Sequence, residues 1–160
     1  MGANSSTGPL SPVEQRHLVQ TWRIIMENPE EHGVNIFKGF LEKYNYFSRF
    51  EKFNGIPMTE LPNNRIFRSH SLSIIKTINQ VIESLHDEEQ TKSLLFLLGR
   101  RHKKFNIRHK EFKELQNIII DYLRNAAKLS REIVASWEKA FSMSLSFVVD
   151  GLEERIPDIP

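Results

Sequence analysis

The stretch LLFLLGRRHK, residues 94–103, places His102 four residues after Leu98, at the end of a leucine-rich run. Residues four apart share one face of a helix, so this spacing puts the imidazole on the apolar face. A polar ring on a buried face needs a partner. For a single histidine, a hydrogen-bonded core residue is the better interpretation.

A second histidine, His70, has the same setting. It lies between Phe67 and Ile74 on the apolar stripe of a helix that Asn63 or Asn64 can cap. The chain also holds eleven phenylalanines, enough to wall an aromatic ligand's pocket. An iron between two imidazoles would satisfy both rings, and a flat apolar macrocycle would explain the aromatic wall. The other histidines are interpreted as non-ligands: His17 and His109 on outer faces, His32 at a helix-packing position, and His86 at a helix end.

Apolar residues recur at helical spacing along most of the chain, without strand-like alternation. Ser11, Pro12 and Glu14 predict a capped helix start. Phe47, Phe50 and Phe53, every third residue, predict a short tight helix, followed by a loop to residue 64. Pro29 either ends the first helix or begins the next. Further helix starts are predicted at Asn63 or Asn64, near Asp87, near residue 109 and after Ser130. Six or seven helices with short connections indicate an all-α domain.

Length and composition fit one folded domain. The chain has 160 residues, of which 39% are hydrophobic and 26% charged. A net charge of +2 is too small to argue for nucleic-acid binding. Cysteine is absent, which excludes disulfides and thioether haem attachment, and no apolar run is long enough for a membrane span. We expect a flexible tail over 1–10, one domain over 11–152 and a second tail over 153–160.

Several motifs resemble the globin family over about residues 11–152. The resemblance rests on three segments: the opening LSP-x-E with Trp22, the segment IFRSH at 66–70, and the leucine-rich run that ends at His102. It implies a globin fold of six to eight helices around one non-covalent haem b, with His102 as the proximal iron ligand and His70 as the distal histidine. The haem-binding residues that it implies are Phe37, Phe50, Phe53, Phe67, His70, Ile74, Leu98, His102 and Ile107.

Two segments, EHGVNIF at 31–37 and LGRRHK at 98–103, are similar to neuroglobin and the related globin X group. This similarity implies that His70 also ligates the iron when no gas is bound. Two departures stand out. First, Asn45 replaces a proline that is usual at a globin corner. Second, Arg101 directly precedes His102, and this leaves open which group orients the ring of His102.

Three classes of function remain open at this point. The first is a haem protein that binds O2, CO or NO reversibly and acts in sensing or in electron exchange with an unidentified partner. The second is a haem-dependent oxidoreductase acting on nitric oxide or nitrite. The third is a haem-free helical interaction module, which an absorption spectrum would distinguish at once.

The N-terminal sequence MGANSS fits the pattern for myristoylation of Gly2. One acyl chain binds membranes only marginally, so attachment would be reversible. We therefore expect a cytoplasmic protein, with a fraction at the cytosolic face of a membrane if Gly2 is acylated.

Overall fold

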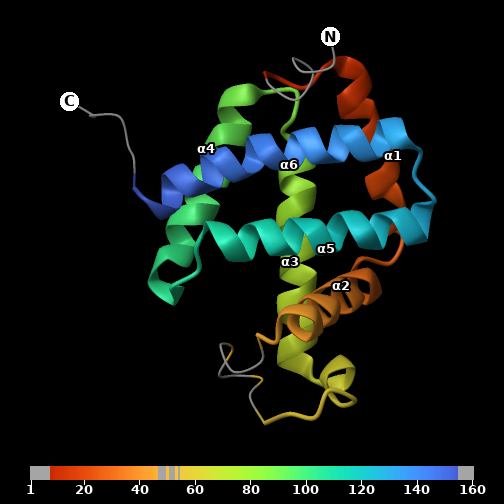
Figure 1. Cartoon of the computed structure of the whole chain (residues 1–160), viewed down its shortest axis with the longest axis vertical. Coiled ribbons are helices and arrows are strands. Elements are labelled where there is room, and N and C mark those ends of the chain that lie inside the picture. Colours follow the sequence, from red (N-terminus) through yellow and green to blue (C-terminus); the bar gives the residue numbers. More distant parts are fainter. Residues whose placement is uncertain (1–7, 47–49, 51–52, 54, 155–160) are drawn as a thin grey trace.

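The computed structural model describes residues 8–46, 50, 53 and 55–154, and its described elements are all helical (Figure 1). The prediction of an all-α fold of six to eight helices is confirmed. None of the described helices is long and apolar enough to cross a bilayer. The α-helices are α1 (Pro12–Met26), α2 (Pro29–Tyr44), α3 (Arg65–Glu83), α4 (Glu88–His102), α5 (His109–Ala127) and α6 (Arg131–Leu152), and the 3₁₀ helices are η4 (Leu61–Asn63) and η5 (Lys103–Phe105).

Local capping explains where the helices begin. Ser11 Oγ accepts from the Glu14 amide at 3.1 Å, and Glu14 Oε1 accepts from the Ser11 amide at 2.8 Å, which completes the predicted capping box. At the starts of α3, α4 and α6, the side chains of Asn64, Asp87 and Ser130 each accept a hydrogen bond from the backbone amide three residues later. The predicted starts of these four helices are therefore confirmed.

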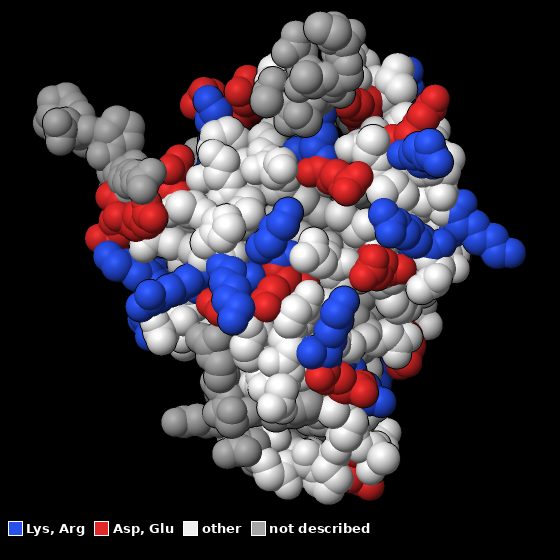
Figure 2. Space-filling view, viewed as in Figure 1, with Lys and Arg blue, Asp and Glu red and all other residues white. Residues whose placement is uncertain are grey.

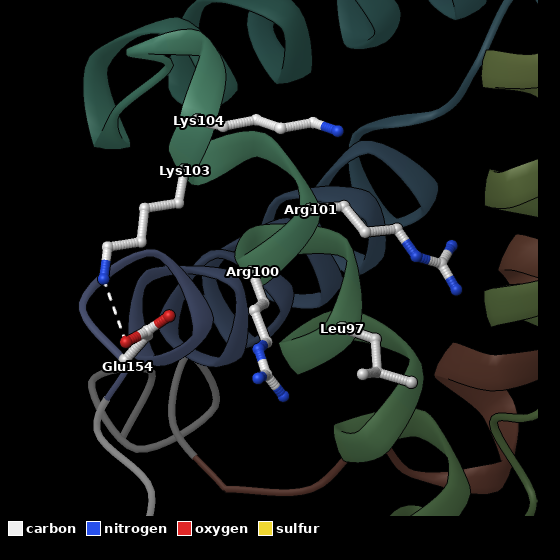
Figure 3. A pocket seen from close by; sticks show the side chains of 6 residues that line it. All are labelled: Leu97, Arg100, Arg101, Lys103, Lys104 and Glu154. Atoms are coloured by element: carbon white, nitrogen blue, oxygen red, sulfur yellow. Dashed lines mark ion pairs between the residues drawn. The ribbon is translucent and has the colours of Figure 1, made fainter.

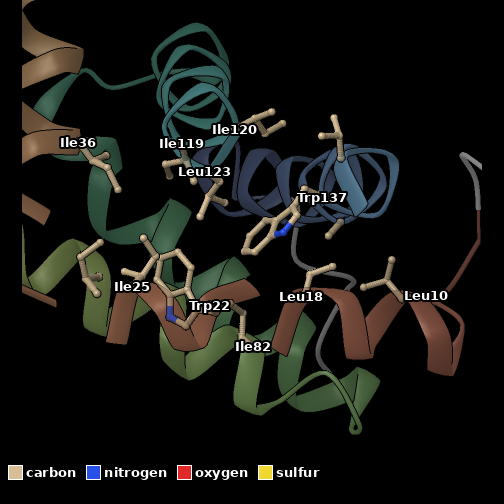
Figure 4. Close-up of a cluster of buried hydrophobic side chains, with 13 residues drawn as sticks. Leu10, Leu18, Trp22, Ile25, Ile36, Ile82, Ile119, Ile120, Leu123 and Trp137 are labelled. Atoms are coloured by element: carbon tan, nitrogen blue, oxygen red, sulfur yellow. The ribbon is translucent and has the colours of Figure 1, made fainter. Parts of the chain in front are cut away.

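The main hydrophobic core forms where α1, α3, α5 and α6 meet. In Figure 1, α5 and α6 run side by side across α3, while α1 lies at one end of them and α4 at the other. Trp22 of α1 and Trp137 of α6 pack at the centre of this core, with ring centroids 5.9 Å apart (Figure 4). Each such buried side chain contributes about 2–3 kcal/mol relative to an exposed one.

A second core is aromatic and lies between α2, α3 and the segment that joins them. Its buried members are Val34, Phe37, Phe40, Leu41, Tyr46, Phe53, Leu61 and Phe67. The Phe53 amide donates to the Phe50 carbonyl at 2.8 Å, a three-residue step that suits the predicted tight helix; Phe47 lies outside the described residues. The predicted loop contains η4, in which Pro62 occupies the first turn, where proline is tolerated.

The buried face of α3 differs from the predicted one. The sequence predicts Phe67, His70, Ile74, Ile78, Val81 and Leu85 as the inner face. The most buried residues are Phe67, Ser71, Ile75 and Ile82, while Ile74, Ile78 and Leu85 are half-buried and still pack against the two cores. Gly33 of α2 permits a close approach to this face, since a Cβ built there would lie 2.7 Å from the Ser71 carbonyl oxygen. The backbones of α2 and α3 therefore touch along the Ser71 face, and His70 lies on the neighbouring face.

Candidate functional site

The imidazole of His102 is oriented by the backbone of its own helix. His102 Nδ1 lies 2.7 Å from the carbonyl oxygen of Leu98, one turn earlier in α4. A carbonyl oxygen only accepts hydrogen bonds, so Nδ1 carries the proton and Nε2 keeps its lone pair. This is the tautomer that a metal-ligating histidine needs, and the Leu98 carbonyl is the orienting group that the sequence left open.

Apolar rings surround His102. Phe112 of α5 lies 5.2 Å from it and Phe105 lies 6.3 Å from it, centroid to centroid, both edge-on. Leu98 and Ile107 are half-buried, and Ile107 follows Asn106, whose φ of 56° closes η5. Phe112 is absent from the predicted pocket, although its place on the apolar stripe of residues 109–127 was the signal that could have included it.

The predicted distal residues gather around His70. Its ring lies 4.8 Å from Phe37, 6.3 Å from Phe50 and 6.4 Å from Phe53. Phe67 stacks on Phe37 at 5.3 Å. Phe37 is only 2% exposed, yet the His70 side chain is exposed on this aromatic wall. Ile74, one turn beyond His70, packs against the same cluster.

Ion pairs fix the start of α3, which carries His70, against α2. Arg68 donates to Glu30 at 3.0 Å and also to Glu31, and its other nitrogen donates to the Pro62 carbonyl at 2.7 Å. The hydrogen bonds to Glu31 and then to Glu30 raise the pKa of Arg68 above its ordinary value. Arg68 thus joins α3 to α2 and to the Pro62 carbonyl two residues before His70.

The residues present fit a haem. Among the described residues, no group of three or more His, Asp or Glu side chains could hold a bare metal ion. A haem iron needs only one or two protein ligands, because the macrocycle supplies four. In the neutral ring, His102 Nε2 offers the lone pair that such a ligand needs, and the exposed ring of His70 lies on an apolar wall that suits a flat macrocycle.

Two of the remaining histidines have structural partners. His17 Nδ1 lies 2.8 Å from Ser136 Oγ, which joins α1 to α6, so the expected outer-face position is wrong. His32 Nδ1 lies 2.6 Å from Tyr122 Oη of α5, in agreement with the helix-packing interpretation. In each ring, the Nδ1 atom has a hydrogen-bonding partner on a neighbouring helix.

Known proteins share this fold and sequence pattern. The family model described as Globin matches residues 34–147. Cytoglobin-2 of Danio rerio is 30% identical over 138 residues, covering 82% of this chain and 76% of the relative. The haemoglobin of the botfly Gasterophilus intestinalis superposes with a TM-score of 0.85 at 22% identity, covering 90% of this chain and 99% of that one. A hexa-coordinate haemoglobin of Drosophila melanogaster gives a TM-score of 0.82 at 22% identity, covering 87% and 93%. The predicted family is confirmed, and this chain belongs to the haem-binding globins.

Proposed function

We propose that this globin holds a non-covalent haem b between His102 and His70 and binds a diatomic gas reversibly, in a sensing or redox role. The observation that carries the proposal is the ring of His70, which is exposed yet lies 4.8 Å from the buried ring of Phe37. A histidine in this position suits an axial ligand. The hexa-coordinate state of the Drosophila melanogaster haemoglobin, which shares the fold, is consistent with it.

Different residues of the chain act on the two faces of the haem. His102 offers Nε2 on the proximal side, held in place by the Leu98 carbonyl. Phe37, Phe50 and Phe53 exclude water from the distal side. The absence of cysteine requires that any haem be held without thioether bonds. The haem iron would supply the position at which O2, CO or NO binds.

Ligation of the iron by His70 lowers the apparent affinity for a gas. An incoming gas competes with the imidazole, so the apparent affinity falls in proportion to the fraction of molecules in which His70 has swung away. Such a protein responds to gas concentration and to redox state together. This behaviour suits a sensor or a redox protein better than an oxygen store.

The test is the absorption spectrum of the ferrous, gas-free protein. We expect the low-spin, six-coordinate form for the parent and the five-coordinate, high-spin form for His70→Leu, which should also bind CO faster at low CO concentration. His86→Leu is the matched control, because His86 is exposed beyond the end of α3. A high-spin parent, or a low-spin His70→Leu variant, would contradict ligation by His70.

We also propose reversible membrane attachment through acylated Gly2, which lies outside the described residues. The support is the MGANSS motif alone. A single myristoyl chain gives an association constant of about 10⁴ M⁻¹, so the protein would divide between cytoplasm and membrane. Co-expression with an N-myristoyltransferase and intact-mass measurement of parent and Gly2→Ala test it. An unmodified parent mass would contradict the proposal.

A further inference from the structure

Positive charge gathers around the end of α4 that carries His102. A groove of about 740 Å³ lies there, and Figure 3 shows the side chains around it. We call it the basic groove. Its lining residues are Leu97, Arg100, Arg101, Lys103, Lys104 and Glu154. In Figure 2, Lys and Arg side chains cluster on the left of the molecule, over the region where α4 ends and α5 begins.

Most of this charge is not neutralised locally. Lys103 Nζ pairs with Glu154 at 3.0 Å, and this contact lowers the pKa of the Glu154 carboxyl. Among the described residues, no ion pair within 4.0 Å engages Arg100, Arg101 or Lys104. In Figure 3 the ends of all three side chains lie apart from the Glu154 carboxylate. Arg100 also acts on Glu154 through space and helps to lower the pKa of that carboxyl, so among the described residues Arg101 and Lys104 are the groove cations without an acidic partner.

Helix stability explains only part of the cluster. Cations in the last turn of a helix interact favourably with its dipole, which accounts for Arg100 and Arg101. Lys103 and Lys104 lie beyond α4, in η5, and extend the cluster past that turn. The helix dipole does not explain why the cations line one groove.

Exposed apolar side chains accompany the cations. Leu97 is 41% exposed and Phe105 is 61% exposed, the highest value among the large hydrophobic residues described. Small interfaces of transient redox complexes bury under about 1,200 Å² and depend on electrostatic attraction for encounter. A basic groove with apolar side chains in and beside it fits such an interface.

The position of the groove indicates what it would serve. Arg101 and Lys103 are the chain neighbours of His102, and the ring of Phe105 lies 6.3 Å from the His102 ring. A protein docked here would contact the segment that carries the proximal ligand.

We propose that the basic groove docks an acidic electron-donor protein. This inference rests on the proposed haem site. The groove residues would hold the partner beside the segment that carries His102; a bound ferric haem would accept one electron from the partner's reduced cofactor and become ferrous, with no atom transferred. An anionic bilayer is the less favoured occupant, because a hollow with the exposed apolar side chains of Leu97 and Phe105 in and beside it suits a protein surface better than a flat layer of headgroups.

The experiment compares two variants with equal loss of charge. The first is Arg100→Gln/Arg101→Gln/Lys104→Gln, which neutralises the groove. The second is Arg16→Gln/Arg23→Gln/Arg131→Gln, whose three exposed arginines lie on α1 and at the start of α6, away from the groove. Haem-loaded full-length proteins are measured for binding to immobilised oxidised flavodoxin, an acidic flavoprotein, and for reduction by flavodoxin hydroquinone.

We expect the groove variant to raise the dissociation constant by about tenfold at low ionic strength, and the control variant by no more than about twofold. The difference should shrink in high salt, because the Debye length falls from about 10 Å at 0.1 M to about 3 Å at 1 M. The rate of reduction by flavodoxin should fall in parallel, whereas dithionite should reduce all three proteins alike.

Each contrary outcome is distinguishable. A parent that does not bind flavodoxin, or equal losses in both variants, overturns the proposal. If the groove variant keeps flavodoxin binding and loses sedimentation with vesicles of phosphatidylcholine and phosphatidylserine, the groove binds lipid instead and the proposal is wrong. The absorption spectra of the same samples report the coordination of His70 and His102 separately, so failure of the haem proposal would be seen on its own.

Discussion

Gly99 of α4 lies directly against the backbone of Val148 in α6. A Cβ built on Gly99 would come 2.0 Å from the Val148 carbonyl oxygen, and one built on Gly151 would come 2.0 Å from the Phe96 carbonyl oxygen. The two helices can therefore touch only because each has a glycine at the crossing. Since α4 also carries His102, this contact fixes the position of His102, the proposed proximal ligand, relative to the core.

Replacing Gly99 with alanine should force α4 away from α6. Overpacking of this kind costs about 1–3 kcal/mol, so the free energy of unfolding should fall by that amount in urea titrations. Haem transfer to an apo-globin acceptor should become faster, because the proximal segment is displaced.

Gly39→Ala is the matched control, since a Cβ at this helical position meets nothing within 4 Å. It should raise the unfolding free energy by up to about 1 kcal/mol through helix propensity. If Gly99→Ala behaved like Gly39→Ala, the close crossing of α4 and α6 would be incorrect.

Replacing His102 with alanine should remove the proximal ligand. We expect loss of most haem or a strongly altered Soret band, together with a lower melting temperature, because bound haem stabilises the folded state by mass action. His86→Ala, at an exposed site, should leave both unchanged. Normal haem content and an unchanged spectrum in His102→Ala would eliminate the proximal assignment.

The carboxylate of Glu14 makes part of the stability dependent on pH. Burial acts against its charge, but hydrogen bonds from Ser11 and from Lys139, whose Nζ is 2.9 Å away, outweigh burial and lower the pKa of Glu14. A lowered pKa in the folded state stabilises the fold at pH values above the unfolded pKa. This stabilisation is lost as the pH falls through the folded value.

Glu14→Gln keeps an oxygen for the capping box and removes the charge. The variant should be less stable than the parent at neutral pH, and the two should converge in acid, once the parent's Glu14 is protonated. Denaturant titrations across this pH range measure the difference. If the difference in unfolding free energy between the two proteins stayed constant down to the lowest pH, the charge of Glu14 would not contribute to stability.

The phenol of Tyr122 links α5 to α2. It receives a hydrogen bond from Asn35 at 3.3 Å and lies 2.6 Å from His32 Nδ1. Tyr122→Phe removes both contacts and should cost about 1–3 kcal/mol, since one such hydrogen bond has a net value of about 0.5–1.5 kcal/mol. In a double-mutant cycle with His32→Phe, the double variant should lose less stability than the sum of the two single losses; strict additivity would mean that the two side chains do not interact in solution.

The sequence by itself determined the starts of four helices and the family. Caps act within three or four residues, so Ser11, Asn64, Asp87 and Ser130 specify their helix starts without knowledge of the rest of the fold. The spacing of Leu98 and His102 also follows from helical periodicity alone. The globin resemblance then implied the haem from the two histidines and their aromatic neighbours.

Only the tertiary structure decided which faces and surfaces these helices present. The most buried face of α3 includes Ser71, where Gly33 permits the close approach of α2, and Asn45 ends α2 at a φ of 54° where the family pattern has proline. The close crossing at Gly99 and the charges left facing solvent around the basic groove likewise depend on which helix lies opposite. Periodicity shows that a face is apolar, but the steric fit between distant segments selects the residues that meet, and no local pattern contains that information.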